Sequence, residues 1–405
     1  MRAGILGIFF LSVASSLWGQ DPRNKLLPPD SAQIAQGREG VRDGFGQDLE
    51  KAKTAFARKE LAQRMLQVAK LPNQSAEYRW ALFECARNLA VVNGDVPLCI
   101  QTLDDFTKVF NVNRAEIVSE TAEKLWKTVP VARSGPLFEL IEKTADTAVK
   151  VDDYKSAMQL FSLGNRFAQS TKDAWLVNRF DSRWRRTKAL AKDYGDVNDD
   201  DERMGRFLCF RKNDWNLGLL LLDKSTDAEL SAVVKKDLKD PTQAKDRIAL
   251  GESWMELAEK AKDPEKAGYL RRAYHWFRLG IEGQTGLNKA RIENRMSMAA
   301  EAIESVDVNE DRVTLYEGHW TAVYDDGSRR WDYTILPNGE ATISNSKDRD
   351  GRKSFLYRKN GVVFFVWEDV IERITCQGNS LVLERFWSKD FPRKTHSTGV
   401  AVFKP

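Results

Sequence analysis

Apolar residues recur at every third or fourth position over most of the chain, from about residue 47 to residue 307. Runs such as "LAQRMLQVAKL", "YRWALFECARNLAVV" and "AEIVSETAEKLWKTV" follow this period, whereas alternating β-branched residues are scarce. This spacing is that of an amphipathic helix with one apolar face. The pattern therefore predicts an all-α domain over residues 47–307.

A weak internal repeat lies within this helical region. Its three copies are "DVPLCIQTL" from Asp95, "DYKSAMQLF" from Asp153 and "DWNLGLLLL" from Asp214. Each copy starts with aspartate, continues with an apolar residue such as Trp215, and places a small residue such as Gly218 four positions after the aspartate. Aspartate caps the free N–H groups of a helix start, and a small residue admits a neighbouring helix. The repeat predicts tetratricopeptide-like hairpins, spaced more widely than the roughly 34 residues of a regular array.

From residue 313 the apolar period changes to two, in "HWTAVYDDGSRRWDYTILPNGEATIS", "SFLYRKNGVVFFVW" and "IERITCQGNSLVLERFW". The turn sequences "DDGS", "PNG", "KNG" and "QGN" separate these runs, as in consecutive β-hairpins. About eight strands are expected, and a meander of that size usually curls or closes. The sequence thus predicts an α plus β protein with two domains, the second being a small antiparallel barrel or bent meander sheet over 313–405.

The first residues have the organisation of a signal peptide. Arg2 precedes the apolar run "GILGIFFLSVASSLW", and small residues follow at Ala14, Ser16 and Gly19. The run is shorter than the roughly 20 residues of a membrane-spanning helix. We expect a signal peptide over 1–19 that is cleaved within about 16–20, export to the periplasm or the extracellular space, and no transmembrane segment afterwards. Pro, Gly and mixed charges without periodicity predict a flexible leader over 20–46.

The overall charge argues against nucleic acid as a partner. The chain has 63 Lys plus Arg and 59 Asp plus Glu, a net charge of +4. Such a balance predicts no phosphate-binding basic stripe.

Four cysteines are too few for a disulfide-built fold, even in a compartment that permits disulfides. Cys85 and Cys99 flank the predicted turn "VNGD" and are either bridged or two buried thiols. Their unequal distances from the turn favour the thiols.

No catalytic or metal-binding set stands out in the sequence. Cys209 lies between apolar residues and has no histidine close in sequence to act as its base, which predicts a buried thiol. Large substitutions at Gly218 should therefore cost more stability than Cys209→Ala. "SKDRDG" starts like a calcium loop but lacks the glutamate at the twelfth position. We expect no enzyme activity, no cofactor and no metal. The three histidines lack the spacing of ligands on one helix or hairpin: His275, His319 and His396.

The tryptophans of the β region are the candidate ligand or partner surface. Either they fill the interior of a barrel, or they form an exposed face that stacks on sugars or grips a partner. Gly318 and Trp320 form a Gly-x-Trp that resembles the opening motif of lipocalin-type barrels. The four candidate residues are Trp320, Trp331, Trp367 and Trp387.

The stretch "GRFLCFRKNDWNLGLLLLDKSTDAELSAVVKKDLKDP" and the helices that follow it resemble a helical module of exported planctomycete proteins of unknown function. The helices upstream, from about Ala52, are similar to the N-terminal part of the same family. This resemblance implies export and architecture, and it supplies no catalytic residues. We therefore expect an exported scaffold or binding protein of the cell envelope that binds a protein partner through its helical domain. The alternatives are carbohydrate or small-ligand binding by the β module, and an unrecognised hydrolase.

Overall fold

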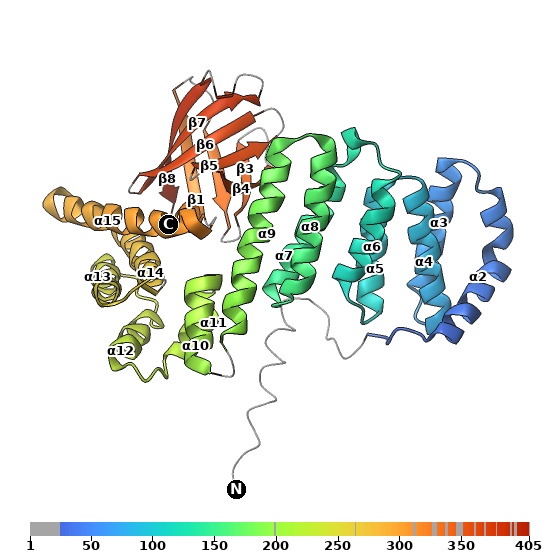
Figure 1. The fold of residues 1–405 in the computed structure, drawn as a ribbon, viewed down its shortest axis with the longest axis horizontal. Coiled ribbons are helices and arrows are strands. Elements are labelled where there is room, and N and C mark those ends of the chain that lie inside the picture. Colours follow the sequence, from blue (N-terminus) through green and yellow to red (C-terminus); the bar gives the residue numbers. More distant parts are fainter. Residues whose placement is uncertain are drawn as a thin grey trace, which may run out of the picture. The chain divides into compact units, whose positions relative to one another are not determined.

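The computed structural model describes residues 25–404 except 198–199, 264, 311–312, 326–329, 337–338, 346–350, 360–361, 368–369, 378, 389–390 and 393–394. The predicted signal peptide and most of "SKDRDG" therefore lie outside the described residues. The chain forms two compact units, residues 1–171 and 172–405. Helices make up the first unit, and helices followed by a barrel make up the second (Figure 1).

The first unit is a series of antiparallel helices in two layers. Helices α2, α4, α6 and α8 follow one another in one layer, and α5 and α7 lie next to each other in the other. The helices are α2 (Ser31–Lys51), α3 (Ala55–Ala69), α4 (Ala76–Val92), α5 (Val96–Val109), α6 (Arg114–Trp126), the short 3-10 helix η2 (Val131–Arg133), α7 (Gly135–Lys150) and α8 (Tyr154–Thr171).

Helix α2 corrects the expectation of a flexible leader over 20–46, which is wrong from residue 31 onward. Asp30 caps the helix, and the side chain of Gln33 binds back to the cap, which closes a capping box. Gly37 has no side chain, and a Cβ atom at this position would overlap the backbone of Glu77 on α4. The glycines that resemble loop residues in the sequence therefore allow close packing of two helices.

The predicted helix starts of the repeat are confirmed. The Asp95 carboxylate accepts a hydrogen bond from the Leu98 backbone N–H at 3.1 Å. Asp153 does the same for Ser156 at 3.1 Å. Asp214, in the second unit, caps α11.

The helices of the second unit lead into the barrel through one continuous core. Buried residues from Cys209 to Ala401 belong to the same apolar cluster. The helical elements are α9 (Ala174–Gly195), α10 (Asp201–Arg206), the π-helix η3 (Phe207–Lys212), α11 (Trp215–Leu222), α12 (Ala228–Asp237), α13 (Ala244–Lys260), α14 (Glu265–Gly280), α15 (Gly286–Glu310) and the 3-10 helix η4 (Thr314–Tyr316).

The contact between Gly218 and Cys209 supports the helix-packing interpretation of this stretch. A Cβ atom at Gly218 would lie 2.9 Å from the Cys209 backbone nitrogen and would overlap the Cys209 sulfur. Cys209 is 1% exposed, and its burial raises the pKa of the thiol far above the ordinary value. A thiol that is buried and protonated is a packing group rather than a nucleophile.

Eight antiparallel strands form a closed barrel, so the predicted β module is confirmed in its closed form. Each strand pairs with the next, and β8 closes the ring by pairing with β1. The strands are β1 (Gly318–Tyr324), β2 (Trp331–Ile335), β3 (Glu340–Asn345), β4 (Arg352–Lys359), β5 (Val362–Trp367), β6 (Val370–Gln377), β7 (Ser380–Trp387) and β8 (Ser397–Lys404).

The boundary between compact units differs from the change of secondary structure. Helix α15 ends at Glu310, close to the expected end of the helical domain, but the two units divide between residues 171 and 172. The reason is that α14 and η4 pack their apolar residues onto the barrel core and so belong with it.

Candidate functional site

The two ends of the barrel have different surroundings. The first, which we call the helix-covered end, comprises Tyr316, Glu317, Trp320 and Phe403. Here the Trp320 Nε1 donates to the Tyr316 backbone oxygen of η4 at 2.9 Å. Arg278 of α14 donates through Nη1 to the Glu317 backbone oxygen at 2.8 Å, although its Nε has no partner within the described part of the chain. Its guanidinium carbon lies 3.9 Å from the centre of the Phe403 ring.

The second end, which we call the Arg385 end, comprises Tyr324, Trp331, Trp367, Arg385 and Ser397. Tyr324 and Ser397 lie at the opposite ends of β1 and β8, the strands that carry Trp320 and Phe403, and the other three lie on β2, β5 and β7. Strand pairing places Arg385 directly across from Ser397, and Tyr324 across from Gly399. Along each strand, side chains point alternately into the barrel and out of it. These five residues are at inward positions, as are the fully buried Ala322 and Ala401.

A fully buried carboxylate, Glu372, joins the aromatic and cationic groups of this end. Glu372 is 0% exposed. Its Oε1 accepts from Arg385 Nε at 3.0 Å and from Nη2 at 2.9 Å, and its Oε2 accepts from the Tyr333 hydroxyl at 2.9 Å. The Tyr324 hydroxyl also donates to Oε1. Burial raises the pKa of the Glu372 carboxyl above its ordinary value, and the charge of Arg385 opposes that rise.

The Arg385 guanidinium is enclosed by rings as well as by the carboxylate. Its carbon lies 3.9 Å from the Tyr324 ring centre, 5.2 Å from that of Trp331 and 5.5 Å from that of Trp367. Cation–π contact and the ion pair with Glu372 therefore hold the same group. Arg385 is consequently a fixed part of the interior wall, with its charge balanced inside the barrel.

Three buried polar atoms around Arg385 have no hydrogen-bond partner among the described residues. They are Trp331 Nε1, Trp367 Nε1 and Ser397 Oγ. Trp367 is only 6% exposed and Ser397 only 4%. Buried donors in native proteins are almost always paired, with the chain or with ordered water. These atoms are therefore candidate contacts for a group from outside the chain, either water or a ligand.

The structure divides the four predicted tryptophans among three environments. Trp331 and Trp367 lie together at the Arg385 end, whereas Trp320 lies at the helix-covered end with its N–H paired. Trp387 is 40% exposed and contacts His396, with ring centres 5.1 Å apart. The four do not form one exposed stacking face.

Sequence reasoning missed Glu372 and Arg385, although a signal for them exists. In β6 the inward positions are Val370, Glu372 and Ile374, so a charge stands where an apolar residue is expected. Arg385 stands at the same phase of β7 and pairs directly across from Glu372. Two opposite charges at inward positions of neighbouring strands predict a buried pair once the register is known.

The histidines and cysteines do not form a second site. His319 pairs across from Lys404 at the far end of β8 from His396, so the two histidines lie at opposite ends of the barrel. Cys85 and Cys99 are not bridged and are two separate thiols. Within the described ranges, no three His, Cys, Asp or Glu side chains gather as metal ligands.

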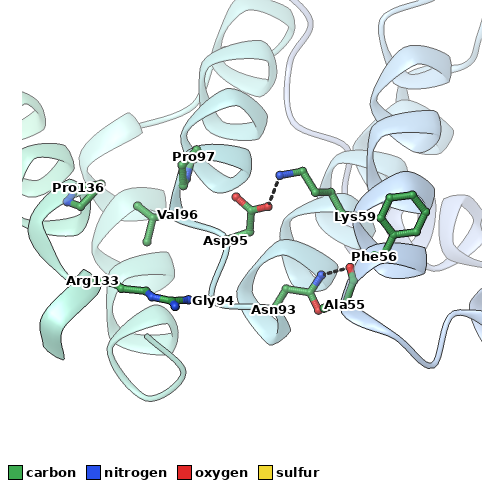
Figure 2. A pocket seen from close by; sticks show the side chains of 10 residues that line it. All are labelled: Ala55, Phe56, Lys59, Asn93, Gly94, Asp95, Val96, Pro97, Arg133 and Pro136. Carbon is green, nitrogen blue, oxygen red and sulfur yellow. Dashed lines mark hydrogen bonds and ion pairs between the residues drawn. The ribbon is translucent and has the colours of Figure 1, made fainter. Parts of the chain in front are cut away.

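A separate cavity of about 460 Å³ lies in the first unit, where α3, α5 and α7 begin (Figure 2). Lys59 and Asp95 pair across it at 2.9 Å. Phe56 borders it and is 71% exposed, and Arg133 of η2 lies on the other side. Asp95 therefore serves both as a helix cap and as a wall of this cavity.

Comparisons with family models, with curated proteins and with solved structures find no match to this chain. Among the helices that the structure describes, none combines the length and the apolar character needed to cross a membrane.

Proposed function

We propose that this is an exported, non-enzymatic binding protein of the cell envelope, and that the Arg385 end of its barrel holds a small ligand. One observation carries the proposal: Trp331, Trp367 and Ser397 bury polar atoms that the described chain leaves unpaired. An unpaired buried donor costs about 1–3 kcal/mol, and a bound ligand that supplies an acceptor recovers this free energy. Burial raises the pKa of the Cys99 thiol to about 12 and that of the Cys376 thiol to about 11. Both thiols therefore stay protonated, which disfavours them as nucleophiles in covalent catalysis.

The experiment is native mass spectrometry of the full mature protein, purified without denaturation from its own cells. We expect an additional mass of one small molecule, which is released when the protein is unfolded. The double variant W331F/W367F keeps an aromatic ring at each position and removes both indole donors, so it should lose most of this mass. W126F is the control, since Trp126 lies on α6 of the first unit, stacked on Phe167. A protein that carries no small molecule, or the same amount in all three forms, would contradict the proposal.

A second function, binding of a protein partner by the helical domain, is supported by the cavity in the first unit. Its border combines an exposed ring, Phe56, with the cation Arg133 at the starts of three helices, whose dipoles add positive potential. A partner segment with one apolar and one acidic side chain fits this combination. The helical scaffold expected from the sequence would then act through this cavity.

Crosslinked capture from the native envelope tests this second function. The variant F56A/R133E should lose a specific crosslinked partner that the unaltered protein retains. V151A is the control, because Val151 is an exposed apolar residue (61%, against 71% for Phe56) that does not border the cavity. If the unaltered protein, F56A/R133E and V151A capture the same partners in the same amounts, the cavity is not the partner-binding site.

A further inference from the structure

At the Arg385 end, the unpaired indole atoms are hydrogen-bond donors, whereas the paired carboxylate of Glu372 is an acceptor. Indole N–H groups can only donate, so Trp331 and Trp367 require acceptors. The buried carboxylate of Glu372 already accepts from Tyr324, Tyr333 and Arg385. What is missing in this part of the described chain is therefore an acceptor rather than a donor.

The charges of this end are already balanced. Arg385 and Glu372 form a buried pair at 2.9 Å with side chains 9% and 0% exposed. A negatively charged ligand would add an uncompensated charge to this interior, or would have to displace Glu372 from Arg385. Burial of an unpaired charge is far more costly than burial of a neutral polar group.

The side chains of the barrel interior beyond these polar groups are apolar. The ring of Phe365 lies 5.1 Å from that of Trp367, between ring centres. Ile343 and Leu383 are fully buried in the same cluster. A sugar, which carries about as many donors as acceptors, would leave its hydroxyl hydrogens unpaired against these side chains.

From these three features, and on the basis of the proposed ligand site, we infer that the ligand is an apolar molecule with an uncharged acceptor. The oxygen of a ketone or ester carbonyl has this character. It accepts from the indole N–H of Trp331 or Trp367 while the Arg385–Glu372 pair stays intact. The carbohydrate expected from the sequence as an alternative ligand is disfavoured by the same reasoning.

The test compares four small molecules of similar size in the full mature protein: acetophenone, benzyl alcohol, benzoate and toluene. The protein is labelled with ¹⁵N, and the indole N–H signals of its 12 tryptophans are followed by NMR. W331F and W367F assign the two signals of the site. Acetophenone should shift both signals in a saturable manner, and it should bind at least about threefold more tightly than each of the other three molecules.

The variants give the expected size of the effect. Loss of one indole donor in W331F or W367F should weaken acetophenone binding by about three- to tenfold, whereas W126F, on α6 of the first unit, should bind like the unaltered protein. If benzoate, benzyl alcohol or toluene shifts the same signals and binds as tightly as acetophenone, the ligand class is wrong and the site stands. If none of the four molecules shifts these signals, both the ligand class and the proposed site are wrong.

Discussion

The two ends of the barrel use the same kinds of side chain with different outcomes. At each end a guanidinium lies 3.9 Å from an aromatic ring centre, Arg278 over Phe403 and Arg385 over Tyr324. At the helix-covered end the indole of Trp320 donates to a backbone oxygen of η4. At the Arg385 end, neither Trp331 nor Trp367 has a partner among the described residues. A helix supplies an acceptor at the end that the helices cover, whereas no described residue supplies one to the two indoles at the Arg385 end, where the proposed ligand would supply it.

The largest effect should come from breaking the buried ion pair. Removal of one partner from such a pair leaves the other charge unpaired, so E372A should lower the free energy of unfolding by about 3–5 kcal/mol. E384A is the matched control on the neighbouring strand, because the Arg373–Glu384 pair is 38% and 28% exposed and lies outside the barrel. Its loss should cost about 0–1 kcal/mol.

Urea unfolding followed by near-ultraviolet circular dichroism of the barrel aromatics measures both effects. If E372A fails to fold, E372Q keeps the shape of the side chain and should still be clearly less stable than E384A. Equal losses for the inner and outer pairs would show that Glu372 does not organise this end.

A smaller effect should separate the paired indole from the unpaired ones. W320F and W367F remove the same volume from two buried sites, but only W320F removes a hydrogen bond and leaves the Tyr316 oxygen unpaired. Without ligand, W320F should therefore be less stable than W367F by about 1–2 kcal/mol. Thermal unfolding of the two variants under identical conditions provides the comparison. W367F as the less stable of the two would mean that its indole has a partner after all.

The smallest effect concerns pH. The folded protein holds the Glu372 proton more tightly than the unfolded chain, because burial raises the pKa of this carboxyl. A group with a raised folded pKa loses its stabilising contribution as the pH rises from the unfolded value toward the folded value. The stability of the unaltered protein relative to E372Q should therefore fall over the range from about pH 4, near the unfolded pKa, up to the raised folded pKa.

Unfolding free energies of both proteins across this range give the slope of their difference. A difference that rises with pH would mean that the pair with Arg385 outweighs burial and lowers the pKa instead.

Much of the fold follows from local pattern, whereas the site depends on register. The period of two in "IERITCQGNSLVLERFW" predicts strands, and Asp95, Asp153 and Asp214 predict helix starts, because both signals are local. The pairing of Glu372 with Arg385 requires knowledge of which residues lie opposite each other in the closed barrel.

Two other differences have the same origin. Gly37 looks like a loop residue until the backbone of α4 is seen against it. Trp320, Trp331, Trp367 and Trp387 are equivalent in sequence, and only their depth and position along the barrel distinguish the two that line the candidate site. In both cases, packing between segments that are distant in sequence determines the environment of the residue.

The central claim is that a molecule from outside the chain completes the hydrogen bonds of the Arg385 end. A high-resolution crystal structure of the protein as purified from its own cells tests this most directly. The account predicts continuous density that is larger than water, with an acceptor atom about 3 Å from Trp331 Nε1 or Trp367 Nε1, and none at Trp320. Isolated waters at both indoles, or side chains packed tightly against them, would contradict it.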